Sequence, residues 1–159
     1  MRLTLEEVYE KYSRNIYNAS FSITGNAQDA EDVLSETLIR YLHTDKQFES
    51  AEHLKAWLLR VALNKAKDMN RSFYRKNHIS FEEYMNDIPV SSKENKELLS
   101  VVMQLPIKMK EVVHLYYYEG YSLKEISRLL RIPEGTVKSR LSSARKELKK
   151  QLKEEWDDA

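Results

Sequence analysis

Apolar residues recur every three or four positions along most of the chain, which is the spacing of one face of an α-helix. The pattern runs first from Leu5 to Tyr17, then from Ala30 to Leu42, and a third time from Leu54 to Met69. A capping box at Thr4–Glu7 is expected to open the first helix, and Gly25-Asn26 to end it. No stretch alternates apolar and polar residues as a half-buried strand does. The pattern therefore predicts an all-α protein.

The helical pattern fades between about His78 and Lys96, where Pro89, two serines and several acidic residues stand together. Such a composition is typical of a flexible linker. We therefore expect two small helical domains joined by a flexible linker. Their expected bounds are residues 1–77 for the first domain, 78–97 for the linker, 98–153 for the second domain and 154–159 for an acidic tail.

Within the second domain, a helix from Leu98 to Leu105 is expected to stop at a proline. The next helix is expected from about Lys108 to near Gly120. The segment from Ser122 to Leu152 then predicts a helix-turn-helix, in which a tight turn joins a short helix to a longer one. Pro133 fits the first turn of the longer helix, where a missing N–H costs little.

Composition narrows the class of protein. Of the 159 residues, 42% are hydrophobic and 32% are charged, so the chain can bury modest cores. The absence of cysteine excludes disulfides and cysteine-ligated zinc, and favours a reducing cytoplasm. No stretch approaches the roughly 20 apolar residues needed to cross a membrane, and the first residues lack the apolar run of a secretory signal.

The formal net charge is only +1, but the charges are unevenly distributed. Residues 51–80 carry seven Lys or Arg against two Asp or Glu, and residues 122–153 carry ten against three. The segments 1–50 and 81–100 are net acidic. Two basic blocks suit two contact zones on a nucleic acid. The alternative is the ordinary uneven charge of solvated helices.

The longer helix of the predicted helix-turn-helix carries polar and cationic residues that can hold phosphates and read base edges in the major groove. These candidate DNA contacts are Thr136, Lys138, Ser139, Arg140, Ser142, Ser143 and Arg145. A helical hairpin with a solvated basic face is the alternative.

The stretch from Leu105 to Leu152 resembles region 4 of the extracytoplasmic-function group of bacterial RNA polymerase sigma factors. The matching elements are Leu105-Pro106, Glu119-Gly120, Glu125-Ile126 and the run "GTVKSRL" from Gly135 to Leu141. The resemblance implies recognition of the minus-thirty-five promoter element by the longer helix. Response-regulator output domains have a similar "GTVK" run, so this stretch alone does not decide the family.

The N-terminal half carries the same resemblance. The stretch "DAEDVLSETLIRYL", residues 29–42, resembles sigma region 2.1–2.2, a helix that docks on the clamp helices of the polymerase β′ subunit. The resemblance implies polymerase contacts at Asp29, Asp32, Glu36 and Arg40. Asp32 and Glu36 are four residues apart and share a helix face. Complementing the helix dipole explains Asp29 and Asp32 well, but it explains Glu36, a full turn later, less well.

The stretch "AWLLRVALNKAKDMNRSFYRKN", residues 56–77, resembles region 2.3–2.4, which in the family opens and reads the minus-ten element. Melting requires cations along the strand and polar or aromatic walls around an extruded base. The residues implied are Arg60, Asn64, Lys65, Lys67, Arg71, Phe73, Tyr74, Arg75 and Lys76. Trp57 is in phase with Leu58 and Val61, which favours core packing.

The resemblance implies an alternative sigma factor that directs polymerase to the promoters of a stress-type regulon. Its implied partners are core RNA polymerase (through the β′ clamp helices and the β flap), promoter DNA, and an anti-sigma factor that is membrane-bound in many members. We expect a monomer when free, since no heptad repeat offers the dimer interface of the alternative, a stand-alone helix-turn-helix regulator. The four histidines follow no metal-ligand pattern, so no catalytic residue, metal or cofactor is expected.

Overall fold

The computed structural model describes the backbone of residues 2–74 and 101–157, and the side chains of residues 2–69 and 101–152. All regular structure within these ranges is helical, which confirms the predicted all-α class. The chain divides into two compact units, Met1–His78 and Ile79–Ala159. The expected linker, residues 78–97, lies outside the described residues.

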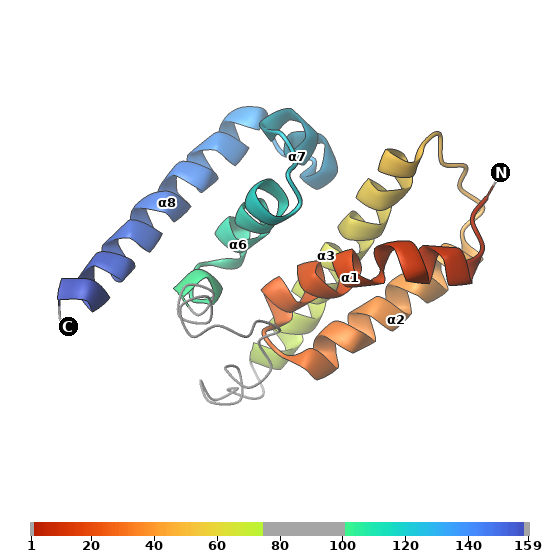
Figure 1. Ribbon diagram of the computed structural model, residues 1–159, viewed down its shortest axis with the longest axis horizontal. Helices are drawn as coiled ribbons and strands as arrows, with labels where there is room; N and C mark the ends of the chain where they lie inside the picture. The colour runs from red at the N-terminus through yellow and green to blue at the C-terminus, as the bar shows by residue number, and fades with distance from the viewer. Residues whose placement is uncertain (1, 75–100, 158–159) are drawn as a thin grey trace. The chain divides into compact units, whose positions relative to one another are not determined.

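The first unit is a bundle of three helices, each of which packs against the other two (Figure 1). These are α1 (Leu5–Thr24), α2 (Ala27–His43) and α3 (Ala51–Tyr74). The predicted apolar faces meet in the core, where Val8, Ile16 and Leu58 are fully buried. Apolar burial of this kind is the main stabilising contribution in a small domain.

Short-range signals fix the helix ends of this unit. Both halves of the predicted capping box form, because Glu7 N donates to Thr4 Oγ1 at 3.1 Å and Thr4 N donates to Glu7 Oε1 at 3.3 Å. Gly25 ends α1 with a φ of 73°, a left-handed conformation that glycine adopts without steric cost. Asn26 then caps α2, since its Oδ1 accepts a hydrogen bond from Asp29 N at 2.8 Å.

Aromatic side chains fix the connection between α2 and α3. The Phe48 ring lies 5.3 Å from the Trp57 ring in an edge-to-face arrangement and 6.2 Å from the Tyr41 ring. Such pairs stabilise beyond the area they bury. Trp57 is only 9% exposed, which confirms its predicted place in the core.

The N-terminal segment is held against the far end of α2. The guanidinium of Arg2 donates to the carbonyl oxygens of Tyr41 and Thr44, and lies 4.6 Å from the centre of the Tyr41 ring. Tyr41 in turn donates its hydroxyl to the carbonyl of Leu3. A cation at the C-terminal end of a helix satisfies carbonyls that have no partner within the helix.

The second unit contains α6 (Ile107–Val113), η1 (His114–Tyr118), α7 (Leu123–Leu130) and α8 (Glu134–Asp157). Both α6 and α7 pack on α8. Their shared core contains the fully buried side chains of Leu115, Ile126 and Val137. Of the helix predicted before Pro106, residues 101–103 are seen as helix and the earlier part lies outside the described residues.

The helix predicted from about Lys108 to near Gly120 is present, but it is not a uniform α-helix. At His114 the chain widens into the π-helix η1, in which Glu119 N donates to His114 O at 3.0 Å. A π-turn contains one residue more than an α-turn, and such turns often occur at functional sites. The apolar spacing predicts a helix here but does not show which of its turns contains an extra residue.

The last helix, α8, differs from expectation at both ends. Pro133 lies just before its first residue and accepts hydrogen bonds from Thr136 N and Val137 N, rather than standing inside the first turn. At the other end, α8 continues to Asp157 and so includes most of the segment expected as an acidic tail.

Candidate functional site

The turn of the helix-turn-helix is built by α7 and the residues that follow it. A capping box opens α7: Ser122 N donates to Glu125 Oε1 at 2.9 Å and Glu125 N donates to Ser122 Oγ at 3.1 Å. The bond from the Ser122 backbone N–H to the carboxylate is the main cause that lowers the pKa of Glu125. Ser127 Oγ donates to Ile132 O at 2.6 Å and so fastens the turn.

Arg131 adopts a left-handed conformation at the end of α7, with a φ of 58°. Non-glycine residues rarely adopt this region because their Cβ crowds the following carbonyl. The sharp turn into α8 therefore carries local backbone strain at Arg131.

The seven candidate residues of α8 do not lie on one face. Adjacent residues of an α-helix point about 100° apart, so spacings of three and four define a face. By this spacing Lys138, Ser142 and Arg145 follow one flank of the buried core side. Thr136, Arg140 and Ser143 follow the other flank, and Ser139 points away from the core. Thr136 and Arg140 are half-buried, whereas the other five are exposed.

Arg145 differs from the other six because its side chain is bonded to residues of η1. Its Nε donates to the hydroxyl of Tyr117 in η1, and the guanidinium lies 5.6 Å from the centre of the Tyr117 ring. The Tyr116 ring is at a similar distance, 5.8 Å. The tyrosine contacts raise the pKa of Arg145 above its already high ordinary value.

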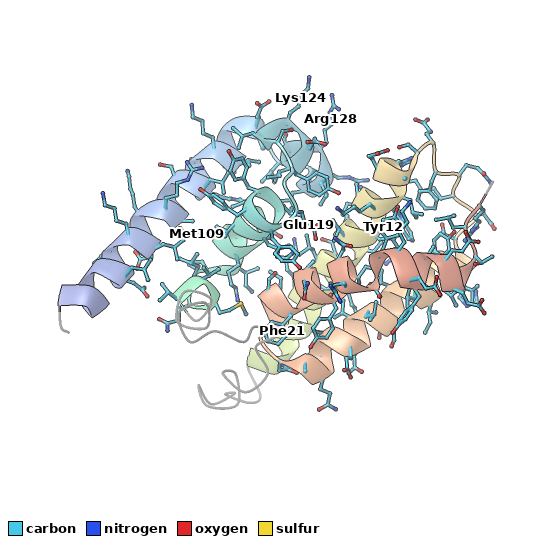
Figure 2. All side chains as sticks on the ribbon, in the orientation of Figure 1. Tyr12, Phe21, Met109, Glu119, Lys124 and Arg128 are labelled. Atoms are coloured by element: carbon cyan, nitrogen blue, oxygen red, sulfur yellow. The ribbon has the colours of Figure 1, made fainter. Side chains whose placement is uncertain are left out.

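Two cations on α7 were missed by the sequence analysis. Lys124 and Arg128 are exposed and stand four residues apart, and both project outward from α7 (Figure 2). The first helix of a helix-turn-helix crosses the DNA backbone, where such cations meet phosphates. Their i, i+4 spacing on the polar side of an amphipathic helix could have identified them.

On α3, three of the candidate minus-ten residues form a single stripe. Arg60, Asn64 and Lys67 are spaced by four and three residues, and Asn64 is exposed. The side chains of Arg71, Phe73 and Tyr74 are outside the described ones, although these residues belong to α3. Arg75 and Lys76 lie outside the described residues altogether.

Lys65 lies off this stripe and faces α2. Its Nζ is 3.0 Å from Glu36 Oε2, and the two side chains are 38% and 53% exposed. The pair therefore joins one candidate DNA contact to one candidate polymerase contact. The ion pair also gives Glu36 a structural role, which complementing the helix dipole did not.

The candidate polymerase face of α2 is mixed in character. Asp29 accepts a hydrogen bond from Asn26 Nδ2 at 2.9 Å, so it belongs to the helix cap. Asp32 and Arg40 are exposed. Ile39 and Leu42 are each 55% exposed. The sequence analysis missed Ile39, which is out of phase with the buried face of α2. It wrongly included Leu42 in that face, because Leu42 follows the buried Tyr41 directly and so points about 100° away from it.

The second unit also buries ionisable groups. Lys110, Glu111 and His114 are all less than one-tenth exposed, and burial lowers the pKa of Lys110 from 10.5 to about 8. His114 stacks on the Tyr118 ring at 4.8 Å, and its Nε2 is 3.6 Å from Glu119 Oε1. Among the side chains of residues 2–69 and 101–152, no cluster of potential ligands could hold a metal ion. No helix within residues 2–74 and 101–157 has the length and apolar character needed to cross a membrane.

Known protein families match this chain in both of its units. The Sigma-70 region 2 family matches residues 8–77, and the Sigma-70, region 4 family matches residues 95–148. Among curated relatives, ECF RNA polymerase sigma factor SigM of Bacillus subtilis (strain 168) is 34% identical, over 92% of this chain and 94% of that protein. SigW of the same strain is 30% identical, over 93% of this chain and 88% of that protein.

Two solved structures show the same fold. One is the sigma factor RpoE in complex with the anti-sigma factor NepR from Bartonella quintana, with a TM-score of 0.74 and 21% identity. It covers 93% of this chain and 96% of that one. The other is CnrH in complex with the cytosolic domain of CnrY, with a TM-score of 0.66 and 22% identity over 94% of this chain and 87% of that one. The two family matches and the curated relatives show that this chain belongs to the ECF RNA polymerase sigma factors of the sigma-70 family.

Proposed function

We propose that this protein binds core RNA polymerase and directs it to specific promoters, as a transcription initiation factor without catalytic activity of its own. The observation that carries the proposal is the presence of regions 2 and 4, in that order, on a chain with half-buried cations on α3 and exposed cations on α7 and α8. Two separate cationic zones suit two contacts on one promoter.

The polymerase contact is assigned to α2. Asp32 and Glu36 present carboxylates to a basic partner, and the exposed Ile39 on the same face adds apolar area. Such a combination suits an interface in which charge guides association and apolar burial holds it. The proposed partner surface is the pair of β′ clamp helices, with Asp29 and Arg40 at the edges of the contact.

The minus-ten contact is assigned to the stripe of Arg60, Asn64 and Lys67 on α3. Cations can follow the phosphates of a strand, while an exposed amide can pair with the edge of an extruded base. The remaining residues proposed for this surface are Lys65, Arg71, Phe73, Tyr74, Arg75 and Lys76.

The minus-thirty-five contact is assigned to the first turns of α8, with α7 on the DNA backbone. Lys138, Ser139 and Arg140 lie near the N-terminal end of α8, the part of a recognition helix that contacts base edges. Lys124 and Arg128 supply phosphate contacts that orient the helix without reading sequence.

We further propose that the free protein is a cytoplasmic monomer and that an anti-sigma factor controls it. RpoE was solved in complex with the anti-sigma factor NepR, and CnrH in complex with the cytosolic domain of CnrY. The stress-type regulon and the domain bounds 1–77, 78–97, 98–153 and 154–159 are part of the same proposal.

In vitro transcription with core RNA polymerase and a promoter library tests the function directly. Addition of the protein should produce initiation at a defined subset of promoters. Asn64→Ala should impair open-complex formation while leaving minus-thirty-five binding unchanged. Arg140→Ala should weaken minus-thirty-five recognition by about 1–3 kcal/mol, the value of a lost base contact. Transcription that does not respond to the protein would reject the function, and loss of core binding alone in both variants would reject the role assignment.

A further inference from the structure

The contact between Arg145 and η1 joins two elements that lie far apart in sequence. One guanidinium donates to the Tyr117 hydroxyl and lies within 6 Å of the centres of both the Tyr116 and Tyr117 rings. The two rings are themselves packed edge to face, with centroids 4.9 Å apart. A cation this close to an aromatic face is attracted by the ring quadrupole.

The geometry depends on the planar shape of arginine and on the π-turn. Neighbouring residues of a regular α-helix point about 100° apart, and so rarely offer both rings to one cation. In η1 both tyrosines reach the same guanidinium. Arginine can stack on a ring and donate a hydrogen bond at once, whereas the ammonium of lysine is a point charge.

The position of Arg145 along α8 points away from base reading. Base edges are contacted by the N-terminal residues of a recognition helix. Arg145 follows Thr136 by nine residues, which at 1.5 Å per residue places it about 13 Å further along the helix. In contrast, η1 leads directly through Gly120 and Tyr121 into α7, so a bond from α8 to η1 restrains how α8 crosses the rest of the helix-turn-helix.

We propose that Arg145 is a positioning residue that reads no base of the minus-thirty-five element. Its contacts with Tyr116 and Tyr117, which we call the arginine clasp, set the angle of the recognition helix α8. This inference rests on the proposed function. It leaves Lys138, Ser139, Arg140, Ser142, Ser143 and Thr136 as the residues of α8 that determine sequence preference.

The test uses holoenzyme assembled from core RNA polymerase and the full chain, with a duplex library randomised across the minus-thirty-five segment. The variants are Arg145→Gln, Arg145→Lys, Tyr117→Phe and the double variant Arg145→Gln/Tyr117→Phe. Lys146→Gln, which removes the next exposed cation of α8, is the control for general charge loss. Arg140→Gln is the reference for a true DNA contact.

Arg145→Gln should lower affinity roughly threefold to tenfold for every sequence alike, because α8 then loses its contacts with Tyr116 and Tyr117 and must be ordered at the moment of binding. The base preferences and the slope of log affinity against log salt should stay unchanged, because no phosphate contact is lost. Arg145→Lys should not rescue binding, and Tyr117→Phe should have no further effect in the Arg145→Gln background.

Three results would overturn the proposal. A changed preference at one base pair would make Arg145 a base reader. A salt slope reduced by about 0.9, together with rescue by Arg145→Lys, would make it a phosphate contact. Independent, additive effects of the Arg145 and Tyr117 variants would show that the arginine clasp does not operate. If wild-type holoenzyme selects no sequence at all, the proposed function fails, and this inference fails with it.

Discussion

The two units bury polar groups of different kinds. In the first unit the buried polar side chains are hydroxyls that donate to backbone carbonyls: Ser20 Oγ to Ile16 O at 2.6 Å, Thr37 Oγ1 to Val33 O at 2.7 Å, and Thr24 Oγ1 to Asn26 O at 3.3 Å. The second unit instead buries the ionisable side chains of Lys110, Glu111 and His114. A buried hydroxyl with a partner costs little, whereas a buried charge is expensive.

Because of this difference, we expect the two units to respond differently to a substitution or to a change of pH. The stability of the first unit rests on apolar and aromatic packing, and should be sensitive to lost volume. The stability of the second unit includes charges held out of water and a left-handed arginine, and should be sensitive to pH and to local substitution. Four predictions test this contrast.

The largest effect is expected from removing the aromatic centre of the first unit. Trp57→Ala should destabilise that unit by about 3–5 kcal/mol, because a large buried side chain leaves a cavity. Hydrogen exchange should show lost protection in α1, α2 and α3 and unchanged protection in α8. Tyr9→Ala is the matched control, since this aromatic residue of the same unit is 52% exposed and should cost little. Equal loss of protection in both units would show that they do not fold separately.

Lys110→Met should stabilise the second unit at neutral pH. The pKa of Lys110 is lowered from 10.5 to about 8 in the folded state, so between these pH values the unfolded chain holds a proton that the folded chain has released. The free energy of unfolding therefore rises as the pH is raised through this window. Below pH 8 Lys110 is protonated in both states, so the folded protein bears the full cost of burying its charge. This cost is at most about 3 kcal/mol, at 1.4 kcal/mol per pKa unit.

Chemical denaturation of wild type and Lys110→Met from pH 6 to 11 measures this effect. The difference between the two proteins should be greatest below about pH 8 and shrink as the pH approaches that of free lysine. Lys108→Met, at an exposed position of the same helix, is the control and should show no such dependence. A constant difference across the range would reject the burial argument.

A smaller gain is expected at the turn between α7 and α8. Arg131→Gly should stabilise the second unit by about 0.5–1 kcal/mol, because glycine adopts positive φ without crowding. Gly120→Ala, at a φ of 75° in the same unit, should destabilise it by a similar amount for the converse reason. Thermal unfolding of both variants measures the contrast, and a shift of the same sign in both would contradict it.

The smallest effect concerns the pair formed by Lys65 and Glu36. A double-mutant cycle with Lys65→Gln and Glu36→Gln should give a coupling of about 0.2–1 kcal/mol in the free protein, the usual worth of an exposed ion pair. The coupling should decline at high salt. Asp32→Asn, one turn earlier on α2, should leave it unchanged. A coupling that persists at molar salt would mean that the contact is not mainly electrostatic.

Much of the fold was predictable because its signals are local. The capping residues Thr4 and Ser122, the break at Gly25, and the buried faces of α1, α2 and α3 all follow from spacings of a few residues. The candidate residues on α8 were also found locally, from polar and cationic residues at helical spacing, whereas those on α2 and α3 came from the family resemblance. Their roles remain proposals that rest on family membership.

What could not be predicted depends on contacts between distant segments. The pairing of Lys65 with Glu36 requires the register of α2 on α3, and the arginine clasp of Arg145 on Tyr117 spans 28 residues. The apolar spacing does not show the extra residue of the π-turn at His114. Such features arise from how helices dock, which no short stretch of sequence encodes.

The anchor formed by Arg2 has a consequence for how the protein is made. A ribosome synthesises Arg2 before it synthesises α2, so the carbonyls of Tyr41 and Thr44 that accept its hydrogen bonds arrive only after α2 is nearly complete. Domains fold as units while synthesis proceeds from the N-terminus. The first unit therefore cannot reach its final form until its second helix has left the exit tunnel, and an N-terminal fusion that displaces Arg2 should delay or weaken that closure.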